Sequence, residues 1–554
     1  MAAERFEDGK DDKTTLILLQ SEDGVEFVVS ELEASQSKEI DRNIWRQRRK
    51  QVSHLDGGDE TKCSPIRLSV SVQGRTLAKV IEYWKKHACG GTADDADADW
   101  DAEFIHVDHE TLFDLVWASN YLQIQGLLGL ACKTLANKIK GKSPNEICHI
   151  LNIRNVFTPE IYEEQSSGCC TSQVTAAMEI ISNGKTCVNQ ELQLLEKTLW
   201  ALDIVRCQEF TVYDPKHKGF VCYRFNNYNM AFFDYDKETS FYQGPPLHTI
   251  PAPMCESTVR SCVNVVSLKV RESDVGFPIN VFGTVIARDQ LDYRCVYLFR
   301  RESDDSQFIS SRDDMLSLTD PCRALVPDDK VYFEINLKIR CDGGAIKDLS
   351  KGVVNFDWVR LPTGKETRPL GLESMLSSVE LSCAHVYHPV EATIAINILK
   401  GPCILSRVAA STPGNFRDHI ILYDDSSEAA TGTRTVLGDG VSVPLTRRVV
   451  AVPLKQKLVL FLVGGDVLEH LALTLGHSDE VLVRKMGSAE VEVRVAWTAV
   501  PVYPSKRKQL HRNKRLVLHA SPPLKSSPVS YLLSLHLIQF LLMESSICDI
   551  WKKM

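Results

Sequence analysis

The sequence predicts a multidomain α+β protein, in which a helix-rich α/β module precedes an antiparallel β sandwich or barrel. The chain has 554 residues, and at about 100–200 residues per domain this length suits three or four domains. Apolar residues recur at helical spacing as far as about residue 206 and alternate with polar residues from Val263 onward. With 44% hydrophobic and 25% charged residues, the composition excludes collagen-like and largely disordered chains.

The N-terminal segment begins with a hairpin signal and continues with helices. Two short apolar runs lie between Thr15 and Val29, and an Asp-Gly turn at residues 23–24 separates them. Apolar residues then repeat at helical spacing over residues 77–84, 112–122 and 127–139. We therefore expect a compact α/β module dominated by helices.

The end of the third helix and the start of the next one can be read residue by residue. Gly141 can adopt the left-handed conformation that ends a helix. Ser143, Pro144 and Glu146 then supply a cap, a proline at the first helical position and a glutamate at the third. A new helix is predicted to begin at Pro144.

A helical and aromatic connector follows. Residues 191–206 have helical spacing, and residues 210–242 hold eleven of the 43 aromatic residues of the chain. Within them, Lys218 to Tyr223 resembles part of the aromatic motif of four-stranded RNA-binding sheets. The second aromatic of that motif is missing and no matching upstream strand is evident, so a packing layer between domains is the favoured interpretation.

The C-terminal half alternates apolar and polar residues with the period of half-buried strands. Residues 331–340 and 491–498 show this pattern most clearly. Similar runs occur at residues 265–270, 279–287, 390–398, 419–423 and 457–462. At least seven strands without convincing intervening helices predict an antiparallel sandwich or barrel.

The cysteines and the apolar segments indicate the cellular environment of the protein. The seventeen cysteines are scattered and contain no C-x-x-C motif, which favours reduced thiols in the cytosol or nucleus. The N-terminus lacks the apolar core of a secretory signal, and the longest apolar run, Val529–Met543, is too short and polar to span a membrane.

The net charge of −8 is unevenly distributed. From Ser505 onward nine Lys or Arg residues face two acidic ones, a balance of +7, so the preceding body carries −15. An acidic body argues against a nucleic-acid-binding face over most of the chain. The tail holds a candidate nuclear-import or phosphate-binding cluster, for which the alternative is a solvated tail: Lys506, Arg507, Lys508, Arg512, Lys514 and Arg515. Residues 46–50 form a second basic cluster with the same two interpretations.

No catalytic signature is found. The chain lacks a Walker loop and the G-x-S-x-G and H-E-x-x-H motifs. Cys383, His385 and His388 are the nearest metal-ligand pattern, but alternation along a strand places His388 on the opposite face, so an ordinary strand surface is favoured. We expect no catalytic residue, no metal site and no cofactor.

Four ordered blocks of the N-terminal segment resemble the plant Skp family of adaptors. They are LAKVIEYWKKH, WDAEFIHVD, TLFDLVWASNYLQI and KGKSPNEICHILNIRNVFTPE, and the resemblance spans about Lys13 to Gln165. It implies a BTB/POZ-type fold that bridges a cullin and an F-box protein in ubiquitin ligases. After Gln165 the sequence departs from the acidic helix and Trp-containing lock that end the family's adaptors, and after Ser37 a charged stretch replaces an apolar amphipathic one.

The resemblance divides the module into two partner faces. It assigns Asn120 and Tyr121 to the cullin-facing block. It assigns five residues of the following helical region to F-box binding: Pro144, Ile147, Leu151, Ile153 and Phe157. Independently of the resemblance, Ile147 and Leu151 lie four residues apart on one helix face, so a partner helix could cover them. The alternative is that this strip packs on the chain's own linker.

The C-terminal half resembles a β-rich domain of unknown function that is frequent in grasses. The matching segments are Ser273–Arg301 and Lys400–Asp424, and they suggest a cereal or related plant source. This resemblance implies no activity. We expect five regions: an adaptor module over 13–165, a helical linker over 166–209, an aromatic connector over 210–262, a β domain over 263–503 and a poorly ordered tail over 504–554.

The sequence thus predicts a non-enzymatic adaptor that acts in the nucleus and cytoplasm in ubiquitin-dependent protein degradation. Its predicted partners are a cullin and either an F-box protein or a substrate held directly by the β domain, with no nucleic acid and no membrane. Two alternatives stay open: a degenerate Skp-like interaction protein that no longer works in a ligase, and an enzyme or ligand-binding protein that uses the β domain.

Overall fold

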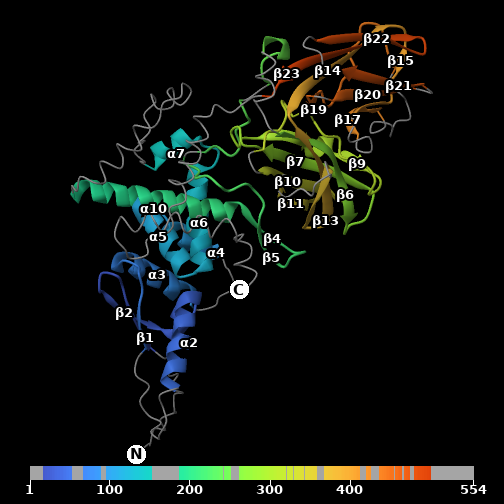
Figure 1. Cartoon of the computed structure of the whole chain (residues 1–554). Helices are drawn as coiled ribbons and strands as arrows, with labels where there is room; N and C mark the ends of the chain where they lie inside the picture. Colours follow the sequence, from blue (N-terminus) through green and yellow to red (C-terminus); the bar gives the residue numbers. More distant parts are fainter. Residues whose placement is uncertain are drawn as a thin grey trace, which may run out of the picture. The chain divides into compact units, whose positions relative to one another are not determined.

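The computed structural model describes residues 16–52, 66–88, 95–151 and 186–500 (Figure 1). Short gaps within the last range are residues 232, 241–242, 251–260, 320, 328–329, 342, 358–366, 412–418, 426–435, 455, 465–466 and 475–478. Within the described part, residues up to 209 together with 228–233 form one compact unit, and residues 210–227 with those from 234 onward form a second. Each unit has its own apolar core.

The first unit contains the predicted hairpin as part of a small mixed sheet. Strands β1 (Leu16–Gln20) and β2 (Glu26–Ser30) pair antiparallel, and β3 (Ile66–Ser69) pairs parallel with β1. Gly24 takes a φ of 85° in the hairpin turn, a conformation that glycine adopts without strain. Ile17 and Leu19 are fully buried, so one face of β1 belongs to the core.

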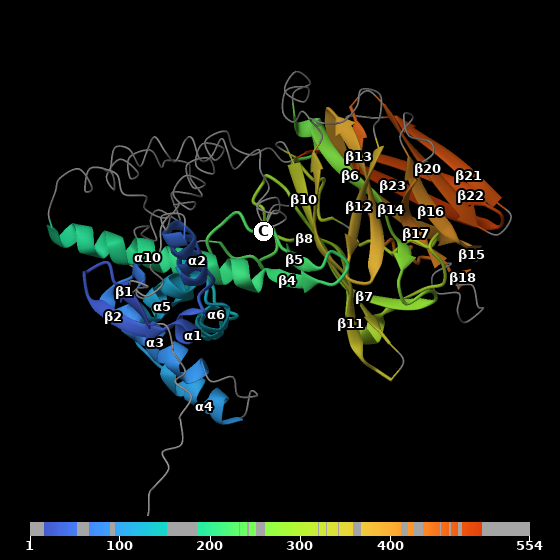
Figure 2. The ribbon, with the colours of Figure 1, turned by 90° about the horizontal axis from the view of Figure 1, so that it is seen from below.

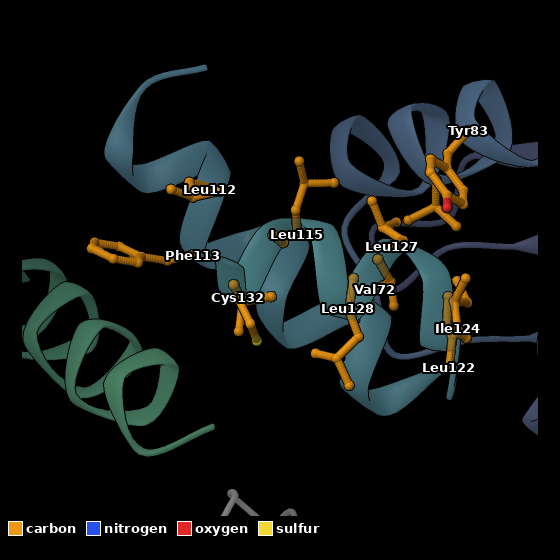
Figure 3. Close-up of a cluster of buried hydrophobic side chains, with 14 of the residues drawn as sticks. Val72, Tyr83, Leu112, Phe113, Leu115, Leu122, Ile124, Leu127, Leu128 and Cys132 are labelled. Carbon is orange, nitrogen blue, oxygen red and sulfur yellow. The ribbon is translucent and has the colours of Figure 1, made fainter. Parts of the chain in front are cut away.

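Helices make up the rest of the first unit. They are α1 (Glu31–Ala34), α2 (Lys38–Val52), α3 (Gly74–His87), α4 (Asp95–Phe104), α5 (His109–Tyr121), α6 (Gln125–Ile139), α7 (Pro144–Ile150) and α10 (Thr186–Glu209). The helices predicted over residues 77–84, 112–122 and 127–139 are confirmed as α3, α5 and α6. Their apolar faces form one core, of which Figure 3 shows Leu115, Leu127 and Leu128 side by side.

The predicted start of α7 is confirmed in detail. The Ser143 hydroxyl accepts a hydrogen bond from the Glu146 backbone N–H, and the Glu146 carboxylate accepts one from the Ser143 backbone N–H at 2.8 Å. These hydrogen bonds from Ser143 lower the pKa of Glu146. Gly141 adopts a φ of 69° just before this cap, as expected for a helix end.

We expect Ser143→Ala to destabilise the first unit by about 1 kcal/mol, because an N-cap hydroxyl that satisfies a helix N–H contributes about this much. Urea unfolding of the full chain followed by circular dichroism measures the change. Lys142→Ala, at the exposed neighbouring position, is the control. An equal effect of both substitutions would show that the cap hydroxyl contributes nothing specific.

The second unit begins with a short hairpin and two sheets around a shared core. β4 (Thr211–Asp214) pairs with β5 (Gly219–Cys222). One sheet has the order β11-β10-β7-β8, with β9 on β7, and the other has the order β12-β13-β6. Their bounds are β6 (Ser261–Ser273), β7 (Ile279–Arg288), β8 (Val296–Arg301), β9 (Gln307–Ile309), β10 (Lys330–Arg340), β11 (Ile346–Asp357), β12 (Thr367–Ser374) and β13 (Ser377–Tyr387). The unit also has two short 3-10 helices, Leu247–Thr249 and Ser303–Asp305.

A second pair of sheets follows along the chain. One has the order β19-β14-β23-β22 and the other β17-β16-β20-β21, and a small pair joins β15 to β18. Their bounds are β14 (Pro389–Lys400), β15 (Cys403–Ile404), β16 (Arg407–Ser411), β17 (Ile420–Asp424), β18 (Val436–Leu437), β19 (Val449–Pro453), β20 (Lys457–Gly464), β21 (Val467–Thr474), β22 (Glu480–Met486) and β23 (Ala489–Ala499).

The antiparallel β-rich fold class is confirmed, and the sheets stay open instead of closing into a barrel. All seven predicted strand runs are present, as β6, β7, β10, β14, β17, β20 and β23. Along β10, Val331, Phe333 and Ile335 are fully buried, as the alternation requires.

Buried polar groups join the two pairs of sheets within the second unit. Asn264 on β6 donates its side-chain N–H to the Ala451 carbonyl and accepts from the Ala451 backbone N–H, at 2.8 and 3.0 Å. Glu391 on β14 accepts from the backbone N–H of Ala324 at 2.7 Å and from the Thr498 hydroxyl at 3.2 Å. An apolar residue in place of Asn264 or Glu391 would leave the backbone groups of Ala451 or Ala324 buried without these hydrogen bonds, and each unpaired polar atom would carry a desolvation penalty.

Candidate partner-binding surface

Asn120 and Tyr121 lie exposed at the C-terminal end of α5. The helix starts at Asp108, whose carboxylate accepts from the Thr111 backbone N–H at 2.9 Å; the hydrogen bonds from Thr111 lower the pKa of Asp108. The buried residues of α5 face the core and thereby determine which of its side chains are exposed. Tyr121 is 39% exposed and stacks on Trp117, with the ring centroids 5.4 Å apart and the planes nearly parallel. The side chains are therefore presented on a rigid aromatic support.

Helix α2 anchors the turn that follows α5. The Ser37 hydroxyl donates to the Leu122 carbonyl at 2.6 Å, and the Arg42 guanidinium donates to the Gln123 side chain at 3.2 Å. Gln123 itself has a φ of 54°, which a non-glycine residue adopts at some cost. The charged stretch after Ser37 thus forms a helix that holds the Asn120–Tyr121 turn in place.

The candidate F-box residues divide between the described and undescribed parts of the chain. Pro144 is half-buried at the first position of α7, while Ile147 and Leu151 are only 3% and 5% exposed. Both belong to the core of the first unit. Ile153 and Phe157 lie outside the described residues. The apolar strip on α7 is therefore already covered in this chain.

Asp114 is a nearly buried charged residue of α5 that the sequence analysis missed. Its nearly buried carboxylate pairs with the Arg75 guanidinium of α3 at 3.0 Å and with the Lys197 ammonium of α10 at 2.8 Å. Arg75 also pairs with Glu110 at 2.9 Å, and Glu110 and Asp114 together raise its pKa. An acidic residue inside the apolar run LFDLVW was the signal that could have identified it, since a buried carboxylate requires cationic partners.

The nearest metal-ligand pattern is part of the core. Cys383 and His385 on β13 are 0% and 3% exposed, whereas His388 is exposed beyond the strand. The expectation that this pattern forms a strand surface was wrong for the first two residues, because Cys383 and His385 lie on the face of β13 that is buried along the strand. Burial raises the pKa of Cys383 and lowers that of His385 to about 4. Within the described ranges no cluster of three potential metal ligands occurs.

The aromatic motif at Lys218–Tyr223 lies in the two-stranded β4–β5 hairpin. The strand upstream of the motif that pairs with it is the four-residue β4, Thr211–Asp214. Phe220 and Tyr213 are 67% and 51% exposed and pack edge to face, 5.5 Å apart. Two strands do not make the four-stranded sheet of the RNA-binding motif.

The remaining predicted sites add little to this surface. The basic tail cluster at residues 506–515 lies outside the described residues. The cluster at residues 46–50 lies on α2, where Arg48 pairs with Glu31 at 2.6 Å and Arg49 lies over the exposed Trp45 ring. The ten cysteines whose side chains the structure describes are free thiols, and none of the described helices is long and apolar enough to cross a membrane.

Comparison with known proteins decides the family of the N-terminal region. SKP1-like protein 20 of Oryza sativa subsp. japonica is 40% identical over 171 residues, a match that covers 27% of this chain and 89% of the relative. The chain belongs to the SKP1-like family through its N-terminal region. SKP1-like protein 1A of Arabidopsis thaliana is also 40% identical, over 159 residues covering 27% of this chain and 91% of that protein.

Two further findings define what surrounds the SKP1-like region. Residues 125–166 match the dimerisation domain of the Skp1 family, and residues 262–495 match a domain of unknown function, DUF6598. The E3 ubiquitin ligase complex SCF subunit sconC of Arthroderma otae is 41% identical over 158 residues, 26% of this chain and 88% of that protein. The chain therefore joins a nearly full-length SKP1-like region to a second, β-rich domain.

Proposed function

We propose that this chain is a non-enzymatic adaptor of a cullin-dependent ubiquitin ligase, in which the SKP1-like region binds the cullin. The observation that carries the proposal is the match of this region to about nine-tenths of proteins named SKP1-like and of an SCF subunit. The exposed Asn120–Tyr121 turn supports it, since a rigid aromatic at a helix end is a typical interface anchor. Such an adaptor works in the nucleus and cytoplasm and delivers an F-box protein or a directly held substrate for degradation.

The proposal predicts that the full chain binds the N-terminal domain of a plant cullin and that Asn120→Asp with Tyr121→Lys weakens this binding about tenfold or more. Tenfold corresponds to about 1.4 kcal/mol, less than a central aromatic anchor commonly contributes. Isothermal titration calorimetry measures the affinity. Lys138→Glu, an exposed charge reversal near the end of α6, is the matched control.

The outcomes separate the alternatives. If the unmodified chain does not bind the cullin, the adaptor proposal fails and a degenerate SKP1-like interaction protein is favoured. If it binds but the double substitution changes nothing, the Asn120–Tyr121 assignment is wrong. The role of the DUF6598 domain is unknown, and a ligand-dependent shift in its unfolding temperature would favour the ligand-binding alternative.

A further inference from the structure

We propose that the chain carries its own ligand for the F-box side of the SKP1-like region. This cis ligand consists of the last turns of α10, residues 197–209, and the returning segment 228–233. It covers α5, α6 and α7 and excludes a separate F-box protein, so that the attached β-rich domain takes the place of the substrate receptor. The inference rests on the proposed function.

The apolar face of α10 forms part of the SKP1-like core. Ala201, Leu202 and Val205 are at most 1% exposed and belong to the same cluster as the buried residues of α5 and α6. The long α10 helix runs across these two helices in both views (Figures 1 and 2). In Figure 3, Phe113 of α5 points toward the helix drawn in the green of α10. This helix is therefore packed as a core element and not as a free linker.

An ion pair fixes the register of α10. The Lys197 ammonium reaches the nearly buried Asp114 carboxylate of α5 at 2.8 Å. Asp114 also binds Arg75, so the α10 lysine is the second of two cations that contact this carboxylate. The contact ties the connector to one position along α5.

The returning segment reaches α7, the helix assigned to the F-box side. Asn229 donates to the Leu199 carbonyl of α10 at 2.7 Å and accepts from the Ala231 backbone N–H at 3.0 Å. Arg206 donates to the Tyr228 carbonyl. The Ala231 carbonyl then accepts from the Cys148 thiol of α7 at 3.4 Å, and Ala231 is 1% exposed. These hydrogen bonds and the burial of Ala231 thus place the returning segment against α7, the helix whose Ile147 and Leu151 are covered.

Covalent attachment makes this occupant hard to displace. A fully buried Leu or Val side chain contributes about 1.5–3 kcal/mol, and a tethered ligand acts at an effective concentration of about millimolar. A competing partner binds only the open fraction of the chain, so its apparent dissociation constant rises as that fraction falls. A separate F-box domain is therefore expected to bind this chain at least tenfold more weakly than it binds a free-standing SKP1-like protein.

The test measures binding of a purified plant F-box domain to the full chain, with a free-standing rice SKP1-like protein as reference. Leu202→Asp places a charge in the buried face of α10, and Gln208→Asp places the same charge at an exposed position of that helix. We expect Leu202→Asp to strengthen F-box binding about tenfold or more, while Gln208→Asp leaves it at the level of the unmodified chain. Ala231→Arg, which overfills the returning segment, should act in the same direction as Leu202→Asp.

Cullin binding, measured with the same proteins, distinguishes a failure of the cis-ligand inference from a failure of the adaptor proposal. Retained cullin binding by Leu202→Asp or Ala231→Arg shows that the SKP1-like region is still folded. If the unmodified chain binds the F-box domain as tightly as the reference protein, or if neither folded variant binds it more tightly than Gln208→Asp does, the cis-ligand inference is overturned while the adaptor function stands. If Leu202→Asp does not fold, Ala231→Arg alone decides.

Discussion

Replacing Arg323 with Met is expected to destabilise the β-rich unit by about 3–5 kcal/mol, because it leaves the Asp289 carboxylate buried without its cation. Both side chains are fully buried. The guanidinium donates two hydrogen bonds to Asp289, one of them at 2.9 Å, and a third to the Ala324 carbonyl at 3.0 Å. Burial alone would lower the pKa of Arg323, but Asp289 raises it overall.

Urea unfolding of the full chain, followed by fluorescence and circular dichroism, measures this loss. Arg407→Met is the control, since Arg407 forms an exposed pair with Asp424 at 2.8 Å and such pairs contribute about 0–1 kcal/mol. Adding Asp289→Asn to Arg323→Met should recover part of the loss by removing the buried charge. A loss no larger than that of Arg407→Met would show that the carboxylate finds water or another partner.

The second large effect concerns Glu391, whose pKa burial raises to about 7 from an ordinary 4.5. In the unfolded chain this carboxyl ionises near pH 4.5, whereas in the folded unit it stays protonated to about pH 7. The folded state therefore binds more protons between these values, and stability falls as the pH rises through them. A shift of this size corresponds to about 3 kcal/mol.

Glu391→Gln is expected to remove this loss, because the amide stays neutral and can still accept the Ala324 backbone N–H. His385 acts in the opposite sense: burial lowers its pKa to about 4 from 6.5, so it adds stability as the pH rises between these values. The two effects oppose each other up to about pH 6.5 in the unmodified chain. The variant should instead gain stability up to that pH and then level off.

Urea unfolding at pH 4.5, 5.5, 6.5 and 7.5 compares the two profiles. Glu238→Gln removes an exposed carboxylate and serves as the control. The free energy difference between Glu391→Gln and the unmodified chain should grow steadily toward pH 7.5. Parallel profiles would contradict the assignment of a protonated Glu391 to the folded unit.

Local signals in the sequence were sufficient for the long helices and for the most regular strands of the fold. The Asp23-Gly24 turn, the Ser143 cap and the alternation over residues 331–340 each depend on neighbours within a few positions, so their structures follow from backbone sterics and burial of one face. Elements with weaker periodicity were not predicted. Strand β11, for example, has half-buried residues on both faces and pairs only with β10.

The candidate site was predictable in part. The Asn120–Tyr121 turn could be located because its residues carry the family resemblance. The stacking of Trp117 on Tyr121 follows from their i,i+4 spacing on one helix. The anchoring of Gln123 by Arg42 could not be predicted, because it joins the end of α5 to a helix some 80 residues earlier. The Asp114 network likewise depends on partners at Arg75 and Lys197, which no spacing rule connects.

The sequence by itself determined a SKP1-like α/β module, an antiparallel β-rich half and the positions of their most regular helices and strands, because periodicity and caps are properties of adjacent residues. Tertiary structure alone decided that the connector helix packs on α5 and α6, that residues 228–233 return to α7, and that Arg323 meets Asp289 in the interior. Those contacts join residues far apart along the chain, where the choice among partners depends on which buried surfaces and charges fit together in the folded protein. The α7 strip that the sequence left open to either a partner or the chain's own linker is thus covered within the chain itself.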